Sequence, residues 1–184
     1  MTKNITNFSE ILILNNSLYV FDIDETFMVF KNITDKWWAK KINEYLKYYG
    51  DNEKAYFKMH DLFYKIITKE HPKPTDLKGF KNLENVSNKI NNDIIFLTAR
   101  SEQYKELTLK HLNYVYPNIN HDVYFSKEKG LKLKEIIENS KKKYDNIIFV
   151  DDKQYNIDNV LQVLPYTLCY KFDYMEYIYN FENL

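Results

Sequence analysis

The stretch Tyr19-Val-Phe-Asp-Ile-Asp-Glu-Thr26 ends an apolar run with closely spaced acids. An apolar run of this length is typical of a strand buried on both faces of a sheet. Side chains two residues apart at a strand end point the same way, so we expect Asp22 and Asp24 to face one small volume. Two carboxylates that close repel each other unless a cation relieves them, and Mg²⁺ prefers such oxygen ligands. A carboxylate can also attack phosphorus, while a second one exchanges protons with the leaving group and with water.

Three later segments repeat the pattern of polar residues after an apolar run. Phe96-Leu-Thr-Ala-Arg100 offers a hydroxyl that can hold a phosphate oxygen beside the N–H groups of a turn, Lys127-Glu-Lys-Gly130 offers a lysine, and Ile147-Ile-Phe-Val-Asp-Asp152 ends in two acids. Each segment alone also fits a simpler interpretation, namely a helix cap, a solvated lysine or a turn-forming aspartate. Their succession along the chain favours a shared site.

The strands predicted from apolar runs alternate with predicted helices. They cover residues 18–22, 94–97, 123–125, 147–150 and 166–170, and we expect a short helix to close the chain. This alternation predicts a parallel sheet covered by helices on both faces, with ligands at the carboxyl ends of its strands. Residues 28–89 contain helical patterns without a matching strand, so they are predicted to form a small helical cap inserted after the first strand. Residues 1–27 and 90–184 then form the core.

Composition limits the class of protein. The 26 basic and 26 acidic residues cancel, so no global positive field draws the chain to nucleic acid or to an anionic membrane. The chain has one cysteine, Cys169, which predicts a reducing compartment. No apolar stretch approaches the roughly 20 residues of a membrane-spanning helix. We therefore expect a cytoplasmic protein with no membrane partner, either a monomer or a homodimer.

The four segments FDIDET, FLTAR, KEKG and FVDD resemble, in the same order, the signature motifs of the haloacid dehalogenase-like (HAD) hydrolase superfamily. The resemblance covers about residues 18–26 and 92–170. It implies a Rossmann-like three-layer α/β/α sandwich and hydrolysis of phosphate esters, because phosphatases of this superfamily keep an acid at the position of Asp24. The segment Asp35-Lys-Trp-Trp38 resembles a less characterised, acid-phosphatase-like branch.

The resemblance also implies a role for each matching residue. Asp22 corresponds to the nucleophile, Asp24 to the general acid and base, Thr98 to the phosphate-binding hydroxyl, and Lys129 to the stabilising lysine. Lys132 and Lys134 are rivals for that last position. Mg²⁺ would be held by Asp22, by the backbone carbonyl of Asp24, by Asp151 and, as a secondary choice, by Asp152.

The residues that would contact substrate outside these motifs are less defined. Arg100 fits two roles equally, binding phosphate or pairing with an acid. Trp37 and Trp38 fit cap packing, and they are also the best candidates for stacking on a substrate. The four histidines show no metal-ligand spacing and are expected to be structural or exposed.

These residues predict a phosphatase that forms an aspartyl phosphate from a small phosphorylated substrate. A nucleotide or nucleic-acid-end phosphatase is the second hypothesis, against which the neutral net charge argues. A non-catalytic binding module on the same core is the third, against which the intact acids argue.

Overall fold

The computed structural model describes residues 2–173 and has an α/β architecture built on a six-stranded sheet. The strand order is β1-β8-β7-β2-β5-β6, and all five neighbouring pairs run parallel. The strands are β1 (Thr2–Ile5), β2 (Ser17–Phe21), β5 (Asp93–Thr98), β6 (Asp122–Phe125), β7 (Asn146–Asp151) and β8 (Leu168–Phe172). The predicted fold class, a parallel sheet in a three-layer sandwich, is confirmed.

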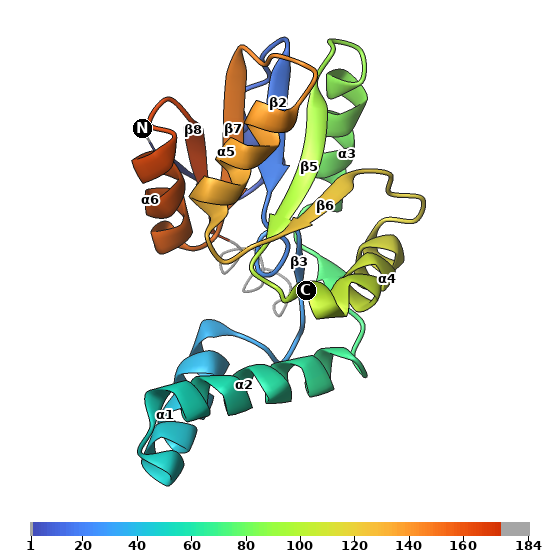
Figure 1. The fold of residues 1–184 in the computed structure, drawn as a ribbon. Helices are drawn as coiled ribbons and strands as arrows, with labels where there is room; N and C mark the ends of the chain where they lie inside the picture. The colour runs from blue at the N-terminus through green and yellow to red at the C-terminus, as the bar shows by residue number, and fades with distance from the viewer. Residues whose placement is uncertain (1, 174–184) are drawn as a thin grey trace.

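Helices cover both faces of the sheet (Figure 1). One face packs against α3 (Leu77–Ser87) and α4 (Lys105–Val115), the other against α5 (Lys129–Asn139) and α6 (Gln154–Val163). The 3₁₀ turn η1 (Phe8–Glu10) buries Phe8 in the first of these clusters, whereas η2 (Glu102–Tyr104) has no buried residue. Because β2 and β7 are apolar on both sides, their residues contribute to both hydrophobic clusters, as a central parallel strand requires.

An edge strand, β1, precedes the strand that the sequence analysis placed first. It pairs with β8 from Thr2↔Cys169 to Ile5↔Phe172, and only Ile5 is fully buried in it. The cap insertion therefore follows the second strand in chain order.

Two helices stand beyond the end of the sheet to which the arrows of β2 and β5 point (Figure 1). These are α1 (Asp35–Tyr49), which Thr34 caps and Gly50 ends at φ 64°, and α2 (Asn52–Ile67), which Asp51 caps. Their connections to the core form the short antiparallel pair β3 (Met28–Val29) and β4 (Lys73–Pro74). The two helices therefore lie over the carboxyl ends of the strands, where the polar motifs are.

The third helix of the predicted insertion, α3, packs against the sheet instead. Its Phe80 and Leu83 are buried in one cluster with Phe21 and Phe96. The range 28–89 thus contains a core helix, because the apolar residues of α3 match the face of the sheet and not the helices of the cap.

The short closing helix expected from the sequence, like residues 174–184 of the predicted core, lies outside the described residues. Within residues 2–173, no helix has both the length and the apolar character needed to cross a membrane.

Candidate functional site

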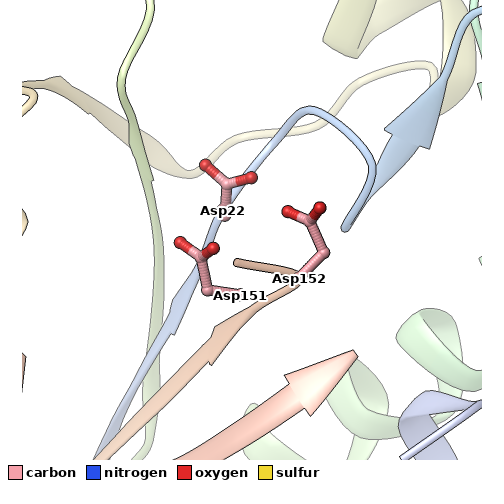
Figure 2. Close-up of side chains that lie close together, drawn as sticks. All are labelled: Asp22, Asp151 and Asp152. Atoms are coloured by element: carbon pink, nitrogen blue, oxygen red, sulfur yellow. The ribbon is translucent and has the colours of Figure 1, made fainter. Parts of the chain in front are cut away.

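The pairing of β2 with β7 brings the first and last motifs together. Phe21 lies opposite Val150, and the N–H of Asp22 donates to the carbonyl of Val150 at 2.9 Å. The next residues on both strands, Asp22 and Asp151, therefore emerge side by side, with Asp152 following. One carboxylate oxygen from each of these three buried acids lies within 4.8 Å of the others (Figure 2).

Lys129 lies between two of these acids. Its Nζ is 2.5 Å from Oδ1 of Asp22 and 2.6 Å from Oδ2 of Asp151, and its side chain has no exposed surface. Burial opposes the charged ammonium, but the carboxylates of Asp151 and Asp22 outweigh it and raise the pKa of Lys129. The rival lysines lie on the outer surface of α5, where Lys132 pairs with Glu135 and Lys134 with Glu138.

Asp22 itself is in a costly environment. Burial raises its pKa well above the usual carboxyl range; Lys129 opposes this shift, and the charges of Asp151 and Asp152 add to it. Burial likewise raises the pKa of Asp152, to which Asp151 and Glu25 contribute while Lys153 opposes. A divalent cation would relieve this repulsion, and an all-carboxylate set of oxygens suits Mg²⁺.

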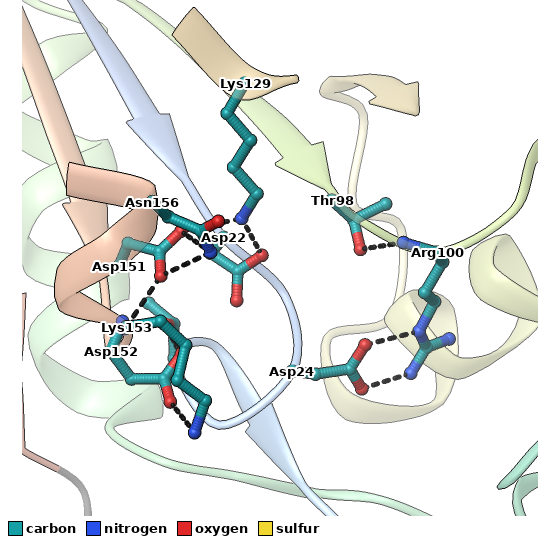
Figure 3. A network of polar contacts seen from close by, with 10 residues as sticks. Asp22, Asp24, Thr98, Arg100, Lys129, Asp151, Asp152, Lys153 and Asn156 are labelled. Carbon is teal, nitrogen blue, oxygen red and sulfur yellow. Dashed lines mark hydrogen bonds and ion pairs between the residues drawn. The ribbon is translucent and has the colours of Figure 1, made fainter. Parts of the chain in front are cut away.

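The two neighbouring acids of the last motif differ in their contacts (Figure 3). Both oxygens of Asp151 accept from Asn156 at 3.0 Å; Oδ1 also accepts from the backbone of Lys153 at 2.8 Å and Oδ2 from Lys129. Asp152 accepts from the Lys153 ammonium at 2.7 Å and contacts the hydroxyl of Thr26 at 3.4 Å. Asp151 is therefore saturated by donors and holds Lys129, whereas Asp152 has the more open coordination.

Asp24 forms a bidentate ion pair with Arg100. Nε donates to Oδ2 at 2.7 Å and an Nη donates to Oδ1 at 2.6 Å (Figure 3). The other Nη of Arg100 donates to Thr108 at 3.3 Å and lies 3.3 Å from Nδ1 of His111. Of the two predicted roles for Arg100, the structure favours pairing with an acid, which orients the Asp24 carboxylate.

The Thr98 side chain is buried at the end of β5. Its Oγ1 accepts from the N–H of Arg100 at 3.2 Å, and its backbone carbonyl accepts from Ser126 at 2.9 Å. The second contact joins the end of β5 to the loop that leads to Lys129.

A cavity of about 440 Å³ lies between these motifs and the cap. From the core it is lined by Asp22, Asp24, Thr98, Arg100 and Asp152, among others. From the cap it is lined by Phe30, Ile33, Trp38, Tyr56, His60, Phe63 and Tyr64. Trp37 does not line it and packs edge-on against Trp38, with ring centroids 5.4 Å apart.

Two stretches of the chain, residues 2–124 and 123–181, match a family described as proteins of unknown function, DUF2608. The chain belongs to the DUF2608 family. A comparison with curated proteins finds no match.

Several residues that support the acids were not predicted from the sequence of this DUF2608 chain. Asn156 and Lys153 open the helix after the last motif, and Thr26 closes the first one. Asn156 could have been predicted, because it is a polar residue in the first turn of the helix that follows the candidate ligands Asp151 and Asp152. The neighbours of Arg100 were not predictable by spacing. Arg100 itself was a candidate through its motif, and it is also the only arginine among the 26 basic residues of this DUF2608 chain.

Two of the histidines set aside in the sequence lie near the site. His111 is buried against Arg100, and burial together with that guanidinium lowers its pKa to about 4. His60 lines the cavity, and burial and Lys127 lower its pKa. Both imidazoles are therefore neutral near pH 7.

Proposed function

We propose that this DUF2608 protein is a Mg²⁺-dependent phosphatase that hydrolyses a phosphate monoester with Asp22 as the nucleophile. The observation that carries the proposal is the buried Lys129 clamped between Asp22 and Asp151. Asp22 lines one cavity with other groups that phosphoryl transfer needs, a second acid at Asp24 and the hydroxyl of Thr98. The resemblance of the four motifs to the HAD superfamily supports the same reaction.

The acid cluster fits a bound Mg²⁺. Asp22 and Asp152 have the more open carboxylates, whereas the oxygens of Asp151 are occupied by Lys129, Asn156 and the Lys153 backbone. We therefore assign Asp22 and Asp152 as the side-chain ligands, with the backbone carbonyl of Asp24 as the third, and give Asp151 the role of positioning Lys129. When bound, Mg²⁺ would supply positive charge to the phosphoryl oxygens.

The protein groups then account for two in-line steps. In the first, Asp22 attacks phosphorus and forms an aspartyl phosphate, while the Lys129 ammonium offsets the charge on the transferring group. Asp24 gives a proton to the leaving oxygen and in the second step takes one from the attacking water. Arg100 keeps the Asp24 carboxylate aimed into the cavity, and Thr98 hydrogen-bonds a phosphate oxygen.

Release of phosphate from p-nitrophenyl phosphate tests this reaction. The wild type should turn over only with Mg²⁺, and Asp22→Asn should lower kcat by at least about a thousandfold because an amide cannot attack phosphorus. Circular dichroism checks that the variant is folded. Undiminished turnover in a folded Asp22→Asn protein would refute the mechanism.

The cavity lies between the core and the cap helices α1 and α2. This position favours a small substrate over the end of a nucleic acid, which would have to enter beneath these helices. A catalytic role accounts for the contacts of Lys129 with Asp22 and Asp151 and for the Asp24–Arg100 pair, whereas a non-catalytic binding module requires neither. A cytoplasmic location, expected from the single cysteine, belongs to this proposal.

A further inference from the structure

The cap side of the cavity has a definite chemistry. Trp38 lies edge-on to His60 and tilted against Phe63, with ring centroids 5.7 Å and 5.2 Å apart. Phe30 and Ile33 extend this wall toward the core and are themselves buried. The wall that faces the acids is therefore apolar and aromatic.

Charge in the cavity is confined to the core side. Among the described lining residues the cations are Arg100 and Lys153, and both are already paired with acids, Arg100 with Asp24 and Lys153 with Asp152 and Glu25. His60, which packs against Trp38 in the cap wall, is neutral near pH 7 because burial and Lys127 lower its pKa. A second anionic group on a ligand would thus contact aromatic rings and no unpaired cation of the lining, and the carboxylates of the core side would repel it.

Tyr64 fastens the cap wall to the core. Tyr64 of α2 accepts a hydrogen bond from the N–H of Ser101 at 2.7 Å and stacks on Tyr104 with centroids 3.5 Å apart. Both contacts lie in the segment that directly follows Thr98 and Arg100. The apolar wall is thereby held at a fixed distance from the phosphate-binding groups, and the volume of about 440 Å³ between them suits a ligand of one or two rings.

We propose that the cavity selects monophosphate esters whose leaving group is uncharged and carries an aromatic ring, with Trp38 as the main specificity residue. The inference rests on the proposed phosphatase function. In this arrangement the phosphate lies beside Asp22 and Thr98, with Lys129 behind Asp22, and the ring of the leaving group lies against Trp38 and Phe63. A ring in such a slot gains from apolar burial and from edge-to-face contacts. Sugar phosphates and bisphosphates would lose one or both of these gains.

Phosphonates test the selection separately from turnover, because their carbon–phosphorus bond is not hydrolysed. We would titrate the full chain with methylphosphonate, benzylphosphonate and 4-(phosphonomethyl)benzoate in the presence of Mg²⁺, using calorimetry. Benzylphosphonate should bind at least about tenfold more tightly than methylphosphonate, and the added carboxylate should remove most of that gain. Equal binding of the methyl and benzyl compounds, tightest binding of the carboxylate, or no binding of benzylphosphonate would overturn the inference.

A pair of variants locates the effect. Trp38→Ala should abolish the preference for the benzyl compound while leaving methylphosphonate binding within about twofold. Tyr48→Ala is the matched control, since Tyr48 lies on the same helix but is 80% exposed and outside the cavity. A benzyl preference that survives Trp38→Ala would mean that residues other than Trp38 select the ligand.

The two proposals can fail separately. A preference for benzylphosphonate without turnover of any ester would refute the phosphatase proposal alone. Turnover without that preference would refute only the proposed selection of aromatic leaving groups.

Discussion

At the scale of single residues, the use of arginine is the most informative choice in this chain. Lysine supplies every other basic side chain, yet the partner of Asp24 is an arginine. A guanidinium offers two parallel donors to one carboxylate, which an ammonium cannot do. The pair therefore fixes the direction of the Asp24 carboxylate, and Thr108 and His111 in turn fix the guanidinium.

Arg100→Lys keeps the charge and removes the two-pronged geometry. We expect kcat to fall by up to about 100-fold with little change in KM, because a misdirected acid slows proton transfer without weakening phosphate binding. Steady-state kinetics on p-nitrophenyl phosphate would measure both parameters. Lys110→Ala, an exposed change on α4, is the control. A large rise in KM at constant kcat would instead mean that Arg100 binds the phosphate directly.

His111 makes the stability of the fold depend on pH. Burial and Arg100 lower its pKa from 6.5 to about 4 in the folded state, so between those values the unfolded chain binds the extra proton. The contribution of His111 to the free energy of unfolding is therefore complete above pH 6.5. It falls as the pH drops, by roughly 3 kcal/mol by pH 4.

His111→Gln should flatten this dependence while still offering Arg100 an acceptor oxygen. Urea unfolding at pH 7 and pH 5 would show a smaller loss for the variant than for the wild type, whereas His71→Gln, at an exposed position, should behave like the wild type. The same loss of unfolding free energy in all three proteins would mean that groups other than His111 control the fall in stability at low pH.

At the scale of elements, the close approach of α5 to α6 determines where Lys129 lies. A Cβ on Gly130 would sit 2.4 Å from the backbone oxygen of Asn159 and 3.0 Å from Val163. The two helices can therefore approach this closely only because residue 130 has no side chain. The N–H of Gly130 also donates to Asn159 at 2.7 Å. Any displacement of α5 would be transmitted to the neighbouring Lys129.

Gly130→Ala should therefore reduce both stability and activity. We expect a loss of about 1–3 kcal/mol in the free energy of unfolding, as for other overpacked contacts, together with a fall in kcat. Chemical denaturation and kinetics would report the two effects, with Lys134→Ala on the exposed face of α5 as the control. A variant with wild-type kcat would show that the clamp does not depend on this helix contact.

The elements also separate what the sequence could predict from what it could not. The strands β2, β5 and β7 were predictable because each is an apolar run that ends in a motif. The edge strand β1 was not, since its Thr-Lys-Asn-Ile has little apolar pattern and its pairing depends on β8, more than 160 residues away. The motif residues were predicted from their places after apolar runs, and their roles from the resemblance to the HAD superfamily. The cap wall could not, because the contact of Trp38 instead of Trp37 with the cavity depends on how α1 is rotated over the sheet.

At the scale of the whole molecule, the acid cluster joins two halves of the chain. Asp22 follows β2, near the N-terminus, and Asp152 follows β7, after the cap and the remaining core have been formed. Without a cation, burial of these carboxylates and, to a smaller extent, the repulsion among them oppose folding, and both effects raise the pKa values of Asp22 and Asp152. A ligand that binds only the folded arrangement stabilises the entire domain.

Mg²⁺ should therefore raise the thermal unfolding midpoint of the wild type. At about 100 times its dissociation constant the gain is about 2.7 kcal/mol, which corresponds to roughly 5–10 °C for a chain of this length. Asp152→Asn should be at least as stable as the wild type without Mg²⁺, because it removes one buried charge, and should gain little when Mg²⁺ is added. Asp158→Asn, an exposed change on α6, should keep the full Mg²⁺ response. An equal upward shift in Asp152→Asn and the wild type would place the bound Mg²⁺ outside this cluster and remove the metal from the proposed reaction.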